Sequence, residues 1–133
     1  MNTEFVYYAA PHGGGKTKWL VEKALKEAEK GNKIVLWHCN SFKYRKFMEY
    51  FYSNYGKICT VHSAEWLHEI PSGSVVLIDD LTSLDTNCTS IETLNGKVKR
   101  VYITVNGTTD NNTELDIDPN QLTIDDIIKE TNT

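Results

Sequence analysis

The segment from Ala10 to Thr17 constrains the fold of this chain more than any other feature. It reads Ala-Pro-His-Gly-Gly-Gly-Lys-Thr and stands between an apolar run, residues 5–9, and an amphipathic stretch, residues 16–30. Successive glycines let backbone N–H groups converge on an anion without side-chain clashes. The N-terminus of a following helix adds positive potential at the same point. The segment therefore predicts a strand–loop–helix unit whose loop wraps a phosphate group.

The side chains of this loop suit a nucleotide and a magnesium ion. Their spacing matches G-x-x-x-x-G-K-[ST], except that Ala10 replaces the first glycine. In this pattern Lys16 reaches the β- and γ-phosphates, and the Thr17 hydroxyl binds Mg²⁺. The expected nucleotide-binding residues are His12, Gly13, Gly14, Gly15, Lys16 and Thr17.

Predicted strands and helices alternate along the rest of the chain. Strands are expected over residues 4–9, 34–37, 58–61, 75–78 and 101–105, and helices over 16–30, 41–55, 64–69 and near 91–94. This alternation predicts an α/β fold, a three-layer sandwich in which helices cover both faces of a five-stranded, mainly parallel sheet.

Charge divides the chain into two parts. Residues 1–106 carry 13 basic and 11 acidic side chains, whereas residues 107–133 carry one basic and seven acidic side chains. Residues 107–112 also contain no large apolar side chain. We therefore expect a folded core over residues 1–106 and an acidic extension over residues 107–133, with a short helix at 123–131 that packs on the sheet or docks on a partner.

A second chemical signal follows the most apolar strand. Four apolar residues, Val75 to Ile78, lead directly into Asp79 and Asp80. This arrangement brings a carboxylate to Mg²⁺ at a strand end, so Asp79 is expected to bind the metal together with Thr17. Asp80 is expected to orient the attacking water. Because parallel strands end at one edge of the sheet, Asn106 should lie near the same ligand.

Together these motifs give the span from Phe5 to Asn106 a family resemblance. It resembles P-loop NTPases of the RecA-like, AAA+ and helicase division, in which at least one strand separates the phosphate loop from the acidic strand in sequence. The segment from Val75 to Leu81 looks like the acidic motif of replication initiators and helicase loaders. The resemblance implies ATP and Mg²⁺ as ligands, catalytic roles for Lys16 and Asp80, and a γ-phosphate sensor at Asn106.

The chain also departs from these families. It has no arginine after Arg100, so a lid with a second sensor arginine is not expected. A second motor domain is not expected either, because 133 residues are too few for two domains. The resemblance then implies a minimal ATPase of phage or mobile-element type that serves DNA replication, recombination or packaging. A homo-oligomer in which Arg45 or Arg100 reaches a neighbour's phosphate would supply an arginine finger.

Two other functional classes stay open on the sequence. One is a small-molecule phosphotransferase such as a nucleoside kinase, and the other is a nucleotide-binding switch or interaction module that does not hydrolyse its ligand. Direct DNA contact is a further alternative, because Lys43, Arg45 and Lys46 are interleaved with aromatic residues around Tyr44 and Tyr50. If the protein does not contact DNA itself, the expected partner is a DNA-processing protein.

Composition bears on the cellular compartment. Three cysteines without a C-x-x-C pair predict a reducing environment. No apolar run approaches the roughly 20 residues that a membrane helix needs, and the polar first residues do not resemble a signal peptide. The expectation is a cytoplasmic protein without membrane contact.

Overall fold

A computed structural model of the chain describes residues 2–10, 15–38, 41–81, 91–106 and 113–116. Its elements follow one another in the order β1 (Glu4–Ala10), α1 (Lys16–Glu29), β2 (Ile34–Trp37), α2 (Ser41–Tyr55), β3 (Val61–Ala64), η1 (Leu67–Glu69), β4 (Val75–Leu81), η3 (Ile91–Leu94), β5 (Arg100–Asn106) and β6 (Thr113–Asp116), where η marks a 3₁₀ helix. None of the helices in these ranges has the length and apolar character needed to cross a membrane.

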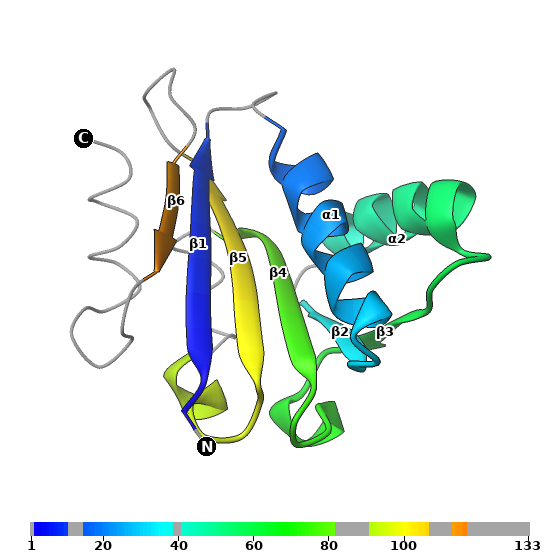
Figure 1. Cartoon of the computed structure of the whole chain (residues 1–133). Helices are drawn as coiled ribbons and strands as arrows, with labels where there is room; N and C mark the ends of the chain where they lie inside the picture. The colour runs from blue at the N-terminus through cyan, green and yellow to red at the C-terminus, as the bar shows by residue number, and fades with distance from the viewer. Residues whose placement is uncertain (1, 11–14, 39–40, 82–90, 107–112, 117–133) are drawn as a thin grey trace.

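The strands form one sheet in the order β3-β2-β4-β5-β1-β6. Strands β1 to β5 run parallel, and β6 pairs antiparallel with β1 (Figure 1). The predicted α/β class and the five-stranded parallel sheet are therefore confirmed. Parallel neighbours need crossover connections, and α1 provides one of them by carrying the chain from β1 past β5 and β4 to β2.

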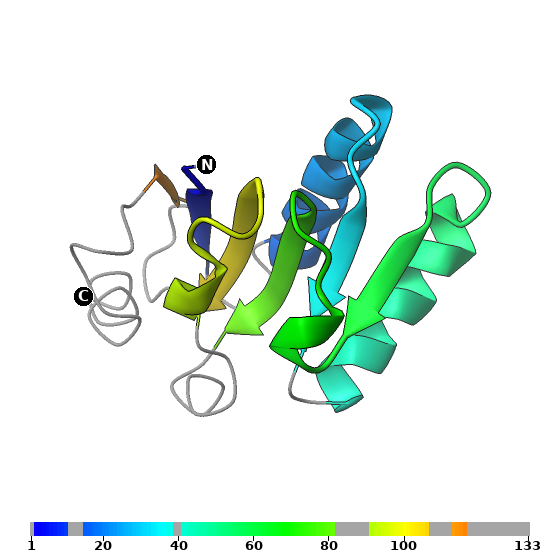
Figure 2. The same cartoon turned by 90° about the horizontal axis from the view of Figure 1, so that it is seen from below.

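Alternating side chains give the sheet two apolar faces. On one face both α-helices pack through a cluster that includes Leu20 and Phe51. On the other face lies a second cluster, which includes Ile70 next to η1 and Leu94 of η3. Among the described residues, α-helices thus cover one face and short 3₁₀ helices lie on the other, instead of the helices predicted on both (Figure 2).

Most predicted boundaries agree with the structure to within one or two residues. Strand β4 continues to Leu81 instead of ending at residue 78, and the short helix expected over 64–69 begins at Leu67. The third strand is displaced as a whole. It was expected over residues 58–61 and instead spans Val61–Ala64. The backbone N–H groups of Ile58 and Cys59 both donate to the carbonyl of Tyr55 and so continue the turn at the end of α2. Ile58 is consequently 75% exposed, despite its apolar side chain.

Strand β6 was not predicted. Residues 113–116 lie in the segment interpreted as an acidic extension, yet their backbone pairs with residues 6–9 of β1. The sheet therefore continues beyond residue 106, and β1 becomes an interior strand. The helix expected at 123–131 lies outside the described residues.

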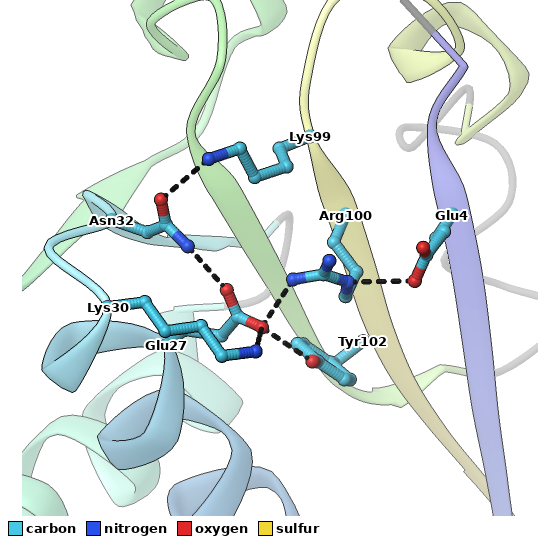
Figure 3. A network of polar contacts seen from close by, with 7 residues as sticks. All are labelled: Glu4, Glu27, Lys30, Asn32, Lys99, Arg100 and Tyr102. Carbon is cyan, nitrogen blue, oxygen red and sulfur yellow. Dashed lines mark hydrogen bonds and ion pairs between the residues drawn. The ribbon is translucent and has the colours of Figure 1, made fainter.

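A buried carboxylate joins α1 to the sheet at the amino-terminal ends of the strands (Figure 3). The side chain of Glu27, on α1, is charged and yet fully buried. The Arg100 guanidinium forms an ion pair with its Oε1 atom, and the Tyr102 hydroxyl donates to the same oxygen at 2.9 Å. Asn32 donates to Oε2 at 2.7 Å. These partners satisfy the charge that burial removes from water.

The same contacts set the ionisation of Glu27. Burial alone would raise the pKa of its carboxyl group. The hydrogen bonds from Tyr102 and Asn32, followed by the charges of Arg100 and Lys30, outweigh burial and hold that pKa below its ordinary value. Glu27 is therefore an anion in the folded protein at neutral pH.

Candidate functional site

The carboxyl-terminal ends of the five parallel strands lie along one edge of the sheet, and those of β1, β5 and β4 point toward the top of Figure 1. In the register of β1 with β5, Ala10 lies directly beside Asn106. Strand β4, which carries Asp79 and Asp80, lies on the other side of β5. The ends of the glycine-loop strand, the Asn106 strand and the acidic strand are thus neighbours. The side chains of Asp80 and Asn106 lie outside the described part of the structure.

The glycine-rich segment leads directly into α1. Gly15 precedes the first helical residue, Lys16, and has the left-handed conformation with φ of 82° and ψ of 22°. Its carbonyl accepts the first helical hydrogen bond, from the Trp19 N–H at 2.9 Å. Lys16 and Thr17 therefore occupy the first turn of the helix, where the positive end of the helix dipole favours an anion. His12, Gly13 and Gly14 lie outside the described residues.

The acidic strand is irregular where its carboxylates begin. Ile78 lies beside Ile103 of β5, but Leu81 lies beside Val105. Two residues of β4, Asp79 and Asp80, therefore span the length that one residue spans on β5. Such a bulge changes the direction of a side chain and is common beside functional sites.

Asp79 is held by its neighbour across this bulge. The Thr104 hydroxyl donates to its Oδ1 atom over 3.0 Å. Thr104 is fully buried, whereas Asp79 is partly exposed. Thr104 was not predicted as a site residue. Its only sequence signal is a hydroxyl in the otherwise apolar end of the strand Val101-Tyr102-Ile103-Thr104-Val105.

The oxygen atoms of Thr17 and Asp79 suit a hard cation. Mg²⁺ is typically bound by one or two protein oxygens together with substrate phosphates and water. The described residues contain no group of three or more His, Cys, Asp or Glu side chains arranged for a metal. The chemistry of Thr17 and Asp79 therefore fits a magnesium ion that arrives with a phosphate ligand.

The two arginines proposed as arginine fingers, Arg45 and Arg100, differ in whether their side chains could reach a neighbouring molecule. Arg45 lies on α2 and is exposed. Arg100 lies at the amino-terminal end of β5, opposite to the site edge, and its guanidinium is occupied by Glu27 and by Glu4, which accepts from Nε at 2.9 Å. Arg100 thus serves an intrachain contact, which leaves Arg45 as the arginine that faces solvent.

Two histidines lie on or next to the parallel strands β2 and β3. His38 follows β2 and is partly buried, and its backbone N–H continues the ladder by donating to Ala64 at 3.0 Å. Burial lowers the pKa of the His38 imidazole, while the charges of Glu65 and Glu69 partly oppose this shift. His62 lies within β3 and is exposed.

Comparison with known proteins gives no relative. No protein-family model, no curated protein and no solved structure matches the chain. A function for this site therefore has to come from its own residues and their geometry.

Proposed function

We propose that this protein binds ATP with Mg²⁺ and hydrolyses it as a minimal P-loop ATPase. The observation that carries the proposal is the left-handed Gly15 at the start of α1, which follows a parallel strand and leads into Lys16 and Thr17. Asp79, a carboxylate near the carboxyl-terminal end of β4, which only β5 separates from β1, supports it. Ligands of parallel α/β sheets bind at this edge.

Each residue of the proposed site has its own role in ATP hydrolysis. The backbone of the glycine loop and the Lys16 ammonium bind the phosphates, and Thr17 and Asp79 hold Mg²⁺. When bound, Mg²⁺ neutralises charge that develops on the phosphate oxygens. Asp80 orients a water whose oxygen bonds to the γ-phosphorus, while the bond from that phosphorus to the β,γ-bridging oxygen breaks. ADP keeps the electron pair of that bond, and the water proton leaves with phosphate or solvent. Asn106 contacts the γ-phosphate.

A measurement of ATP hydrolysis, alone and with single-stranded or duplex DNA, tests the proposal. Wild-type protein should release phosphate only with Mg²⁺, and Asp80→Asn should lower the rate by about 100-fold or more while ATP affinity stays nearly unchanged. Glu65→Gln, an exposed acid just beyond β3, is the matched control and should behave as wild type. Stimulation by DNA would support service in replication, recombination or packaging.

Other outcomes identify the alternatives. Tight ATP binding without turnover under every condition would contradict hydrolysis and favour a nucleotide-dependent switch. Transfer of phosphate to added nucleosides would make the protein a kinase. An absence of ATP and GTP binding would overturn the assignment of the site itself.

Two glycines that flank α1 offer a sharper test of the proposed phosphate loop. Gly15 and Gly31 stand at opposite ends of the helix, both have φ of 82°, and an added Cβ would meet no atom within 4 Å at either position. Gly15→Ala and Gly31→Ala should each cost about 1–2 kcal/mol of stability, because both force a Cβ into the left-handed region. Only Gly15→Ala should weaken ATP binding in calorimetry. Equal effects of the two variants on affinity would argue against a phosphate loop at Gly15.

A further inference from the structure

We propose that Thr104 is the positioning residue that fixes the carboxylate of Asp79 for Mg²⁺. This inference rests on the proposed function and adds a residue to its metal site. Thr104 touches neither nucleotide nor metal in this scheme. It acts through the hydrogen bond that its hydroxyl donates to Oδ1 of Asp79 at 3.0 Å.

The burial of Thr104 indicates that its hydroxyl has a specific role. Thr104 has no exposed surface and lies on β5, an interior strand between β4 and β1. Valine has nearly the same shape and would fill the position without any polar atom. A buried hydroxyl costs free energy unless it is hydrogen-bonded. Packing at this position does not require a hydroxyl. The Thr104 hydroxyl is nevertheless present, and it donates to Asp79, a candidate metal ligand.

The bulge explains why Asp79 needs such a partner. In a regular ladder each residue of β4 would have one partner on β5, but Asp79 and Asp80 together oppose Thr104. The backbone around Asp79 is therefore not fixed by the regular pairing of its neighbours. A side-chain hydrogen bond from β5, which is paired with a strand on each side, restricts the carboxylate instead. Residues that orient metal ligands in this way typically change metal affinity by about 10- to 100-fold when they are replaced.

The test measures how strongly Mg²⁺ supports nucleotide binding. The probe is a non-hydrolysable ATP analogue, titrated by calorimetry in saturating Mg²⁺ and again in EDTA. The ratio of the two affinities reports the metal contribution, independent of catalysis. Thr104→Val should lower this ratio by about tenfold or more and leave the affinity in EDTA unchanged. Thr104→Ser, which restores the hydroxyl, should recover most of the wild-type ratio.

Ser74 provides a matched control. It precedes β4 at the opposite edge of the sheet, is 2% exposed, and donates from its hydroxyl to the Pro71 carbonyl at 2.7 Å. Ser74→Ala thus removes a buried hydroxyl and its hydrogen bond far from the site. It should leave the magnesium ratio at the wild-type value. Thr104→Ala gives a second way to remove the Thr104 hydroxyl, and circular dichroism checks the fold of each variant.

A double-substitution cycle with Asp79 separates the possible failures. Asp79→Asn should lower the ratio at least as far as Thr104→Val, and the double variant should match Asp79→Asn alone. A wild-type ratio in both Thr104→Val and Thr104→Ala, with Asp79→Asn impaired, would overturn the role of Thr104 and leave the ATPase proposal intact. A wild-type ratio in Asp79→Asn, or no analogue binding by wild-type protein, would overturn the proposed metal or nucleotide site as well.

Discussion

Replacing Lys16 with alanine is expected to weaken ATP binding strongly. The ammonium group in the first turn of α1 would otherwise contact the β- and γ-phosphates, and hydrogen bonds between charged groups are among the strongest in proteins. Removal of such contacts corresponds to a loss of affinity on the order of 100-fold. Calorimetry or fluorescence titration with ATP measures the effect directly.

Lys18 supplies the control for this variant. It lies two residues further along α1 and is exposed, so Lys18→Ala removes the same charge from the same helix on a different side. ATP affinity should then remain at the wild-type value. Comparable losses in both variants would indicate a general electrostatic effect of the helix, and wild-type affinity in Lys16→Ala would refute the phosphate-binding assignment.

The largest loss of stability is expected from Arg100→Met. This substitution leaves the fully buried Glu27 carboxylate without its main cation. Loss of one partner from a buried ion pair typically costs about 3–5 kcal/mol in the free energy of unfolding. Urea unfolding followed by circular dichroism provides the measurement. Glu4→Gln is the control, because Glu4 contacts the same guanidinium but is 59% exposed, so its removal should cost at most about 1 kcal/mol.

The pH dependence of stability gives this network a second readout. Because the pKa of Glu27 is lowered in the folded protein, its stabilising contribution is fully present above the ordinary value of 4.5 and is lost as pH falls through the folded-state pKa. Glu27→Gln should flatten this acid limb of the stability curve. An unchanged acid limb in Glu27→Gln, or a loss below about 1 kcal/mol in Arg100→Met, would mean that the network contributes little.

The sequence predicted elements whose signals are local and strong. The helix at 16–30 and the strand at 34–37 correspond closely to α1 and β2, because amphipathic periodicity, a terminal glycine and a continuous apolar run are all readable along the chain. The strand–loop–helix context of Lys16 was likewise visible from neighbouring residues. The short strand β6 was missed because a brief, acid-rich segment carries little apolar signal and depends on its pairing with β1.

Features that depend on which strands and helices are adjacent could not be predicted from the sequence. Glu27 lies in a helical stretch in which charged and uncharged residues are mixed, so its burial becomes apparent only when Arg100 and Tyr102 are placed beside it. Thr104 and Asp79 are 25 residues apart along the chain, and nothing local reveals that their strands are adjacent. The bulge at Asp79 is also a property of two paired strands and has no signature in either strand alone.

The position of β1 in the sheet also has a consequence for the order in which the molecule assembles. Its parallel neighbour is β5, so Glu4 and Ala10 can pair only after Arg100 and Asn106 have been synthesised. Contacts between such distant residues form late and slow the folding of a domain. During synthesis, the first strand to leave the ribosome therefore cannot enter the sheet until almost all of the core has followed. The proposed phosphate loop, although encoded near the start of the chain, would be among the last parts of the proposed site to be held in place.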